Sequence, residues 1–287
     1  MTEKLAFALS GGGSRGALQI GAMYALLEYG LKPDFVIGAS IGAVNATFLA
    51  LNGFSTATID KLASAWRLAQ ASDLMPANYL WLTVRAMFNR SSNDPSHRLR
   101  DFFIAQGLAP ELNFSGINQP NLVIVSADLN TGHPILHGEH PDDIVLDALL
   151  LSTALPPWFM PVRTEDHYLV DGGMVSNLPI EPALKLGATE IVALDLNDSR
   201  ELLGAGEGVR GFFDRLIFAV SKRQIDLELE LAEARRVPLL YIGLTGDTPV
   251  PIWDFTHTDE LITQGYEITR LVIENQRSTN PILADRE

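Results

Sequence analysis

The sequence predicts an α/β fold with a mainly parallel central sheet that is flanked by helices. Short apolar runs of strand length alternate with longer segments whose apolar residues recur at helical spacing. Glycine or proline lies at most of the boundaries between them, as expected for turns. Hydrophobic residues make up 47% of the chain and charged residues 20%, which is close to the composition of packed globular domains. This alternation favours strands that are joined by crossover helices.

The first fifty residues predict a βαβα order. An apolar run leads into a glycine cluster, a helical pattern follows up to Gly30, and a Lys-Pro-Asp turn precedes a second short strand. Another glycine-containing corner separates that strand from a second apolar helix. Consecutive βα units usually place their strands side by side, so both corners are expected at one edge of the sheet. The four elements are strand Leu5–Leu9, helix Leu18–Tyr29, strand Phe35–Ile37 and helix Ala43–Leu51.

The rest of the chain is expected to complete the same single domain, which spans residues 1–287. Its strand candidates are Leu122–Val125, Tyr168–Val170, Ile191–Leu194 and Leu239–Ile242. Two stretches, Asn89–His97 and Gly204–Gly211, are predicted to be surface loops. A late helix is predicted to pack on the sheet rather than to enter a membrane, because its apolar residues share one face. That face comprises Phe213, Ile217, Val220, Leu227, Leu231 and Ala234.

The charge and the cysteine content exclude several classes of function. The chain has 21 Lys and Arg residues against 35 Asp and Glu residues, and its net charge is −14. No broad positive field is available for a phosphate backbone, so nucleic acid is not expected as a partner. The absence of cysteine excludes disulfides, thiolate zinc sites and a cysteine nucleophile. The apolar runs are too short for a signal peptide or a membrane span, which predicts a cytoplasmic chain that begins at Met1.

A glycine-rich loop lies between the first predicted strand and the first predicted helix. Its glycines allow a sharp turn and expose backbone N–H groups at a helix N-terminus, where the helix dipole also favours negative charge. The loop is therefore a predicted anion site, either for a bound phosphate or for a transient oxyanion. A nucleotide-binding or phosphate-binding module is disfavoured, because no acidic residue follows the second strand and no lysine completes a P-loop. The loop consists of Gly11, Gly12, Gly13, Ser14, Arg15 and Gly16.

The second glycine corner has the sequence Gly-Ala-Ser-Ile-Gly at positions 38–42, which predicts a nucleophile elbow. Ser40 is lifted onto a tight strand-to-helix turn, and Gly38 and Gly42 remove side chains that would clash in it. If both corners lie at one sheet edge, Ser40 supplies a nucleophile and the glycine-rich loop supplies hydrogen-bond donors for the oxyanion.

Two residues are candidates for the base that accepts the Ser40 proton. Asp171 ends a predicted strand, and Gly172 and Gly173 after it permit close approach of another segment. His257 is the alternative, because an enzyme with the chain order Ser, Asp, His would recruit it. The other histidines do not follow convincing strand ends and are expected at the surface; they are His97, His133, His137, His140 and His167.

Together these motifs resemble the patatin-like phospholipase family. That family has an oxyanion loop Gly-Gly-Gly-x-Arg/Lys-Gly, a Gly-x-Ser-x-Gly elbow and an Asp-Gly-Gly or Asp-Gly-Ala block, and all three occur here in that order. Residues 152–159 also resemble the family's segment before the aspartate block, with Thr153 where a serine is frequent. The resemblance covers residues 5–195 and leaves the role of residues 200–287 open.

The resemblance implies a patatin-like three-layer sandwich and a catalytic dyad of Ser40 and Asp171 that needs no histidine, metal or other cofactor. It also implies hydrolysis of acyl esters in lipids, such as phospholipids or lysophospholipids, at or near a membrane surface. The chain is acidic, so its contact with an anionic membrane is expected to be transient.

Some further residues have two interpretations. Arg15 could meet a lipid phosphate, but an ion pair within the protein or an exposed charge is favoured. Asp128 and Asp195 also end predicted strands, and hydrogen bonds that anchor loops are favoured over metal binding, because no cluster of histidines or carboxylates accompanies them. An apolar patch could line an acyl pocket or lid, or belong to the core; it comprises Trp81, Leu82, Val84, Met87, Phe88, Trp158, Phe159 and Met160.

Overall fold

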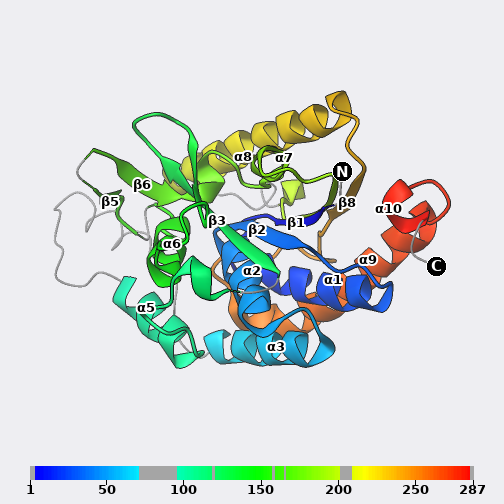
Figure 1. Ribbon diagram of the computed structural model, residues 1–287, viewed down its shortest axis with the longest axis horizontal. Coiled ribbons are helices and arrows are strands. Elements are labelled where there is room, and N and C mark those ends of the chain that lie inside the picture. Colours follow the sequence, from blue (N-terminus) through cyan, green and yellow to red (C-terminus); the bar gives the residue numbers. More distant parts are fainter. Residues whose placement is uncertain are drawn as a thin grey trace.

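The computed structural model describes residues 4–70, 96–117, 120–156, 159–164, 166–200 and 209–284. These residues form a mixed sheet between two groups of helices (Figure 1). Helices α7 and α8 lie on one side of the sheet, and α1, α2, α3 and α9 lie on the other. The predicted fold class is confirmed. The helices are α1 Gly16–Glu28, α2 Ile41–Asn52, α3 Thr56–Gln70, α5 Ser96–Ala105, α6 Val145–Ser152, α7 Ile180–Lys185, α8 Val209–Ala234, α9 Thr258–Gln276 and α10 Pro281–Ala284.

The sheet has the strand order β5-β6-β3-β2-β1-β7-β8, and β4 also pairs with β3. The neighbours from β3 through β2, β1 and β7 to β8 are parallel. At the other end, β4 and β6 run antiparallel to β3, and β5 runs antiparallel to β6. The strands are β1 Leu5–Leu9, β2 Phe35–Ala39, β3 Asn121–Asp128, β4 Pro134–His137, β5 Val162–Arg163, β6 Tyr168–Asp171, β7 Glu190–Asp195 and β8 Leu239–Gly243.

The central strands are apolar on both faces because both faces are covered. In β1, the large side chains of Leu5, Phe7 and Leu9 belong to the core on the side of α1, α2 and α3. Ala6 and Ala8 belong to the smaller core on the side of α7 and α8. Parallel strands that are buried in this way read as continuous apolar runs, which is why the sequence revealed them.

All six strands that the sequence predicted are present, but β4 and β5 were not predicted. Strand β4 begins with a proline, all four of its residues are half-buried, and it lies within a stretch that resembles a surface loop in sequence. Strand β5 has only two residues, and both are exposed. Neither strand has the apolar run or the alternation from which strands are predicted. The loops predicted at 204–211 and 89–97 lie mostly outside the described residues. Their described ends, residues 209–211 and 96–97, belong to helices α8 and α5, so the loop prediction was wrong there.

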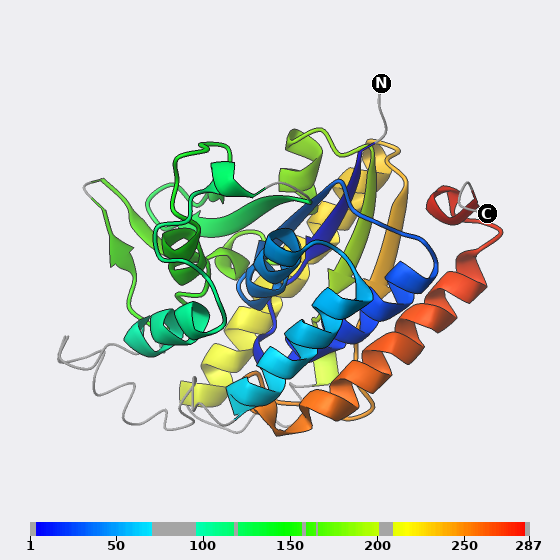
Figure 2. The ribbon, with the colours of Figure 1, turned by 60° about the horizontal axis from the view of Figure 1, so that its bottom comes forward.

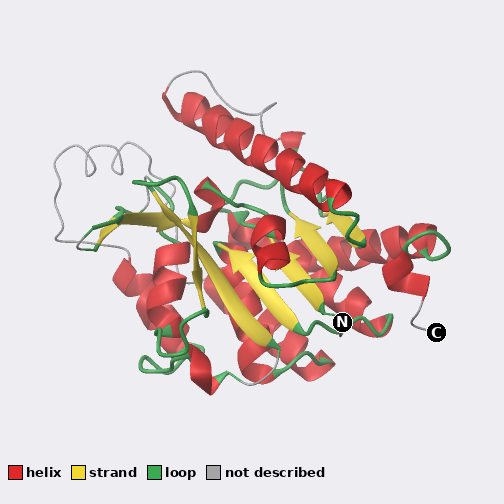
Figure 3. Cartoon of the chain, turned by 45° about the horizontal axis from the view of Figure 1, so that its top comes forward, coloured by secondary structure: helices red, strands yellow, loops and turns green. Residues whose placement is uncertain are grey.

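The late helix packs on the sheet as predicted, and Leu231 contacts the core, but part of the predicted buried face was wrong. Helix α8 packs on the sheet side through Ser221, Ile225, Glu228 and Ala232, which are buried. Two members of the predicted face, Val220 and Leu227, have 37% and 46% of their surface exposed. The prediction failed because polar side chains, which make specific hydrogen bonds beneath the helix, occupy part of its buried face. Figure 3 shows α8 along the outside of the sheet.

Helix α9 lies along α1, and glycines allow the two backbones to approach closely (Figure 2). A Cβ atom on Gly21 would lie 1.9 Å from the Ile262 carbonyl oxygen, and one on Gly265 would lie 2.0 Å from the Leu18 carbonyl oxygen. Neither position therefore tolerates a side chain. Among the described residues, no helix has the length and apolarity that are needed to cross a bilayer.

Candidate active site

Ser40 lies at the turn between β2 and α2 in a backbone conformation that few residues adopt. Its φ is 53° and its ψ is −125°. Only Arg236 shares a positive φ among the non-glycine residues that the structure describes. Such a conformation costs about 1–3 kcal/mol and persists where the surrounding structure holds it. Ser40 is half-buried and lines a cavity, as a serine on a nucleophile elbow should.

Two glycines make this turn possible. A Cβ atom on Gly38 would lie 2.4 Å from the backbone of Gly42. A Cβ atom on Gly42 would lie 2.2 Å from the Leu9 carbonyl oxygen at the end of β1. The turn therefore folds its own backbone tightly together and packs directly against the neighbouring strand, so both glycines of the motif are required by close contact.

Ser152, at the end of α6, holds the backbone of Ser40. The Ser40 N–H donates a 2.9 Å hydrogen bond to Ser152 Oγ, and Ser152 Oγ donates a 2.7 Å hydrogen bond to the Val125 carbonyl oxygen. Ser152 is fully buried, so this contact is shielded from water. One hydroxyl thus ties the elbow to strand β3. The sequence analysis placed Ser152 in a family-like stretch without assigning it this contact.

Asp171 ends β6, and its carboxyl group is buried beside Ser40. Its Oδ1 accepts a 2.8 Å hydrogen bond from the Gly173 N–H, whereas Oδ2 has no hydrogen-bond partner among the described atoms. Burial raises the pKa of Asp171 to about 7, and hydrogen-bonding interactions with the Ser40 side chain and the Gly173 N–H oppose this rise. The Ser40 side chain thus lies close enough to the carboxyl group to affect its ionisation. Such contacts often tighten only when substrate is bound.

The two glycines after Asp171 allow this placement. A Cβ atom on Gly172 would lie 2.1 Å from the Val125 carbonyl oxygen, and one on Gly173 would lie 2.7 Å from Asn177 Oδ1. The aspartate block is therefore pressed against β3 on one side and against Asn177 on the other. These contacts fix the carboxyl group at the edge of the sheet where the elbow lies.

The glycine-rich loop leaves two backbone donors without an acceptor. The N–H groups of its other four residues are engaged, because Gly11 donates to Asn177, Ser14 to Ile252, Arg15 to Gly12, and Gly16 to Gly13 and Ser14. Within the described part of the chain, the N–H groups of Gly12 and Gly13 donate to no protein atom. Both residues line the same cavity as Ser40. Two uncommitted donors beside a serine form an arrangement that can bind an oxyanion.

Arg15 supports this loop from within the protein. Its side chain is 8% exposed, and its Nε donates a 3.2 Å hydrogen bond to the Gly12 carbonyl oxygen. Burial lowers the pKa of Arg15 to about 10, and the charges of Asp198 and Asp195 oppose that change. Of the two favoured interpretations of Arg15, the exposed charge was wrong, and its position near Asp198 and Asp195 agrees with a charge interaction within the protein. Because the Gly12 carbonyl and the Gly13 N–H belong to one peptide group, the bond from Arg15 also orients that N–H.

Asn177 connects the glycine-rich loop with the aspartate block, and the sequence analysis did not identify it. Its carbonyl oxygen accepts a hydrogen bond from the Gly11 N–H at 3.1 Å, and its Nδ2 donates to the Gly11 carbonyl oxygen at 3.4 Å. Its own N–H donates to Gln224 Oε1 on α8. Asn177 therefore holds the glycine-rich loop and the aspartate block in one relative position.

Helix α8 fixes the segment after the aspartate block through the half-buried Gln224 and the buried Glu228. Gln224 Nε2 donates to the Met174 carbonyl oxygen at 2.6 Å. Glu228 accepts hydrogen bonds from Ser176 Oγ at 2.6 Å and from the backbone N–H groups of Ile180 and Glu181 at 2.5 and 2.8 Å. Burial raises the pKa of Glu228 to about 7, against the effect of these three donors. Polar residues at i and i+4 on a helix were the only sequence signal of this contact.

The cavity beside Ser40 has a volume of about 1290 Å³ and a mainly apolar lining. This exceeds the range of about 300–1000 Å³ that is typical of small-ligand pockets. Its apolar part extends from Ser40 between α2, α3 and α5 and includes Val44, Phe48, Leu62, Trp66, Phe102 and Phe103. Phe159 also lines it, whereas Met160 is 43% exposed. The other members of the predicted apolar patch, at 81–88 and at Trp158, lie outside the described residues.

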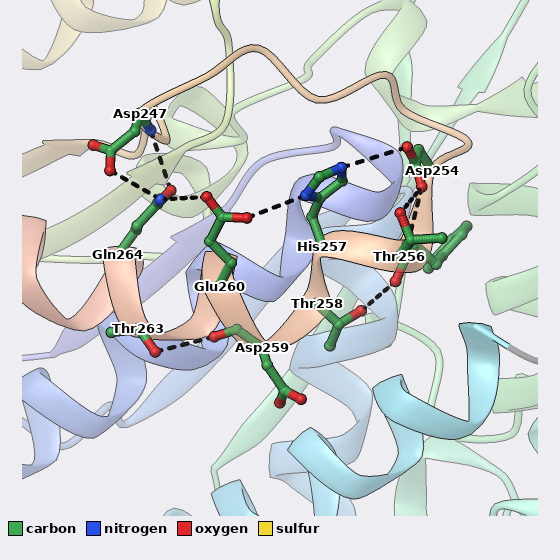
Figure 4. A network of polar contacts seen from close by, with 10 residues as sticks. Asp247, Asp254, Thr256, His257, Thr258, Asp259, Glu260, Thr263 and Gln264 are labelled. Carbon is green, nitrogen blue, oxygen red and sulfur yellow. Dashed lines mark hydrogen bonds and ion pairs between the residues drawn. The ribbon is translucent and has the colours of Figure 1, made fainter.

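His257 does not lie beside Ser40. Its Nδ1 is 3.1 Å from Glu260 Oε2 and its Nε2 is 3.7 Å from Asp254 Oδ2, as Figure 4 shows at the start of α9. Its side chain is 41% exposed, and His257 is absent from the cavity lining, to which nearby Ile252 and Phe255 contribute. Asp254 and Glu260 thus hold the His257 ring in a network of polar contacts at the surface, at the N-terminus of α9.

The remaining candidates have structural roles. Asp128 accepts hydrogen bonds from the Asn130 N–H and from Thr131 Oγ1, and His167 Nδ1 lies 2.8 Å away. Asp195 accepts hydrogen bonds from Tyr241 Oη at 2.7 Å and from the Asn197 N–H at 2.9 Å. Both carboxyl groups therefore anchor loops, as favoured. The prediction that His137 lies at the surface was wrong. His137 is half-buried, and its Nε2 lies 2.8 Å from Ser126 Oγ. No cluster of metal-binding side chains occurs among the described residues.

The chain matches the model of the patatin-like phospholipase family over residues 7–184. This match covers more than half of the sequence and includes both the elbow and the aspartate block. The chain therefore belongs to the patatin-like phospholipase family, a family of serine ester hydrolases.

Individual relatives are consistent with this assignment. Patatin-like phospholipase domain-containing protein 6 of Homo sapiens is 30% identical over 214 residues, which are 73% of this chain and 14% of that protein. Neuropathy target esterase sws of Drosophila melanogaster is 27% identical over 213 residues, again 14% of its length. The chain therefore spans about one seventh of these relatives. The uncharacterized protein YqhO of Bacillus subtilis is 29% identical over 189 residues, 64% of its length.

Human GIVD cytosolic phospholipase A2 is similar in fold. The two structures superpose with a TM-score of 0.56 over 96% of this chain and 59% of the human chain, at 11% sequence identity. At this identity the likeness concerns the fold alone.

Proposed function

We propose that this chain hydrolyses carboxylic esters of lipids, with phospholipids or lysophospholipids as the substrate class, through Ser40 as the nucleophile and Asp171 as its base. The observation that carries the proposal is the position of a buried carboxyl group, with a pKa of about 7, beside a serine on a strained elbow. A base with this pKa is half ionised near neutral pH, where it can both accept and return a proton.

The proposed reaction has two steps. In the first, Ser40 Oγ attacks the ester carbonyl carbon while Asp171 takes the hydroxyl proton; the ester C–O bond then breaks, and Asp171 gives the proton to the departing alkoxide. In the second, Asp171 takes a proton from water as the water oxygen attacks the acyl carbon. The bond to Ser40 Oγ then breaks, and the proton returns from Asp171 to the serine. The net reaction is the hydrolysis of one ester to an acid and an alcohol.

The Gly12 and Gly13 N–H groups stabilise the negative oxygen of each tetrahedral intermediate in this proposal. This role is supported by the fact that neither N–H group has an acceptor among the described residues. Loss of one such donor typically costs about 2.7–4 kcal/mol in the transition state. The bond from Arg15 to the Gly12 carbonyl keeps the Gly13 N–H from rotating away, so the donors need no reorganisation during the reaction.

The apolar cavity supports a long acyl chain as part of the substrate. It extends from the nucleophile between α2, α3 and α5, and its volume of about 1290 Å³ leaves room for more of the lipid than one chain. Aromatic side chains such as Trp66 and Phe103 provide apolar contact area for that chain.

The two alternative functions have less support. A histidine-dependent esterase would need His257 near the nucleophile, but its ring contacts Asp254 and Glu260. A phosphate-binding module would use the donors of the glycine-rich loop, four of which are engaged within the protein.

Hydrolysis of p-nitrophenyl butyrate by four proteins tests the proposal. We expect the wild type and His257→Ala to turn over, and Ser40→Ala and Asp171→Asn to be folded by circular dichroism but inactive. Equal turnover by wild type and Ser40→Ala would show that the elbow is only a turn. Loss of turnover in His257→Ala, with folding intact, would instead favour the histidine-dependent esterase.

A further inference from the structure

Three buried polar side chains form a connected network behind the glycine-rich loop. Trp66 Nε1 on α3 donates a 3.0 Å hydrogen bond to Asn45 Oδ1 on α2. Asn45 Nδ2 donates in turn to Gln19 Oε1 on α1 at 2.9 Å. Gln19 and Asn45 are fully buried, and Trp66 is 4% exposed. We refer to these three residues as the inner network.

The inner network holds the chain at both ends of the glycine-rich loop. Gln19 Nε2 donates a 2.9 Å hydrogen bond to the carbonyl oxygen of Ser10, the residue that precedes the loop. Asn45 Nδ2 donates a 3.0 Å hydrogen bond to the carbonyl oxygen of Gly16, the last residue of the loop. The two uncommitted N–H donors of the loop therefore lie between two carbonyl groups that side-chain amides hold.

The ends of the loop are fixed by further contacts as well. The Ser10 carbonyl shares a peptide group with the Gly11 N–H, which donates to the Asn177 carbonyl oxygen at 3.1 Å. This peptide group is therefore held at both of its polar atoms. At the other end, a Cβ atom on Gly16 would lie 2.8 Å from the Trp66 ring, so the loop packs directly against the inner network.

Every polar hydrogen of the inner network is used. The two hydrogens on Asn45 Nδ2 go to Gly16 and Gln19, and the indole hydrogen of Trp66 goes to Asn45. The second hydrogen on Gln19 Nε2 is directed to the Leu194 carbonyl oxygen at 3.5 Å. A buried polar network that is satisfied in this way specifies one arrangement of the groups that it joins, whereas apolar side chains would fill the same space without orienting the loop.

We propose that Asn45 and Gln19 are positioning residues, which hold the glycine-rich loop so that the Gly12 and Gly13 N–H groups face the oxyanion. This inference deepens the proposed function and rests on it for the role of those two donors. The described lining of the cavity includes Trp66 but neither Asn45 nor Gln19, so these two residues act through the loop and not on the substrate. Trp66 seats Asn45 from the cavity side.

Two variants each release one end of the loop. Asn45→Ala removes the bond to Gly16, and Gln19→Met removes the bond to Ser10 while it keeps an unbranched side chain of similar length. Circular dichroism establishes which variants are folded. If both were unfolded, Trp66→Phe, which removes the N–H that seats Asn45 but keeps an aromatic ring, would be measured in the same way and should show the same changes.

Asn280→Ala is the matched control. The Asn280 side chain is 8% exposed and makes the same three kinds of bond as Asn45. Its Nδ2 donates to the Leu239 carbonyl oxygen and to Gln276 Oε1, and its Oδ1 accepts from the Ile282 N–H. Leu239 begins β8, whereas Ser40 follows the end of β2, and these strands belong to the parallel part of the sheet. The control therefore lies at the opposite edge of the sheet from the site.

Kinetics with p-nitrophenyl butyrate separate positioning from stability. All three alanine or methionine variants should have a lower Tm, because each leaves buried polar groups unpaired. We expect only Asn45→Ala and Gln19→Met to lower kcat, by about ten-fold or more, with KM within about two-fold of the wild-type value. A folded Asn45→Ala or Gln19→Met protein with wild-type kcat, or an equal loss of kcat in Asn280→Ala, would overturn the proposal.

The Gln19 variant also distinguishes the loop from the elbow. Asn45 lies on α2, which begins directly after Ser40, so its replacement could in principle disturb the nucleophile. Among the described residues, Gln19 bonds to Ser10, Leu194 and Asn45, and none of these belongs to the elbow. A loss of kcat in Gln19→Met therefore comes through the loop.

Hydrogen exchange tests the positioning without requiring activity. The engaged N–H groups of the loop are protected in the folded protein, and loosening the loop exposes them to water. We expect deuterium uptake in peptides that cover residues 10–16 to be about ten-fold faster or more in Asn45→Ala and Gln19→Met, and unchanged in Asn280→Ala. If the wild type does not hydrolyse the ester, the proposed function fails, but this comparison still tests the inner network. Unchanged uptake in the folded variants would overturn the positioning role, even in an active enzyme.

Discussion

The hydroxyl of Ser152 should matter more for catalysis than for substrate binding. Ser152→Ala removes the acceptor of the Ser40 N–H and the donor to the Val125 carbonyl, both in a fully buried position. A buried backbone donor without a partner costs about 1–3 kcal/mol, and the carbonyl adds to this. We expect the free energy of unfolding to fall by about 2–3 kcal/mol, which corresponds to a Tm lower by about 5–10 °C.

The same substitution should lower kcat for p-nitrophenyl butyrate by about ten-fold or more. The strained φ of Ser40 is then no longer held by a hydrogen bond, and small displacements of a nucleophile cost much of the rate. KM should change little, because Ser152 does not line the cavity. Thr58→Ala is the control, since it removes a hydroxyl that is 3% exposed and donates to Asn52, away from the elbow. A stable Ser152→Ala protein with wild-type kcat would refute this reasoning.

Two further predictions concern the elbow and helix α8. Gly42→Ala should abolish labelling of Ser40 by a fluorophosphonate and lower the Tm, because its Cβ would lie 2.2 Å from the Leu9 carbonyl oxygen. Gly243→Ala is the control and should behave like the wild type, because its Cβ would lie no closer than 3.5 Å to other atoms. Equal labelling of both variants would contradict the packing argument. The folded-state pKa of Glu228, about 7, exceeds its ordinary value of 4.5, so the folded protein binds the proton more tightly and this group's contribution to stability falls as pH rises through that window. Glu228→Gln should therefore flatten the dependence of Tm on pH between about 4.5 and 7, and an unchanged slope in thermal melts would count against this assignment.

The sequence identified the parts of the site that depend on local chain chemistry. Ser40 and Asp171 lie at the ends of apolar strands and have glycines close by in the sequence. The structure explains these glycines, because Gly42 and Gly172 pack too closely against other backbone atoms to carry a side chain. Parallel strands such as β1 were evident because both of their faces are buried. The structure brings Ser40 and the glycine-rich loop to one edge of the sheet, as the order of βα units predicted. Asp171 reaches the same edge from β6, which runs antiparallel to β3, and the βα order did not predict that.

Other parts depend on contacts between distant segments, which one sequence does not encode visibly. Asn177 and Ser152 act through hydrogen bonds to residues 166 and 112 positions away, respectively. The prediction of the buried face of α8 failed because Glu228 is buried against the sheet side, whereas the apolar Leu227 is exposed. The pattern of hydrophobicity alone could not distinguish a face buried by polar contacts from one that is exposed.

The central claim is that Asp171 is the base that activates Ser40. Its most direct test is the rate of Ser40 labelling by a fluorophosphonate as a function of pH, in wild type and in Asp171→Asn. Burial places the pKa of Asp171 at about 7, and only the ionised carboxylate can accept the serine proton. The account predicts that wild-type labelling rises with pH through an apparent pKa near 7, and that Asp171→Asn labels slowly without this transition. Labelling of the variant at the wild-type rate, with the same pH profile, would contradict the account.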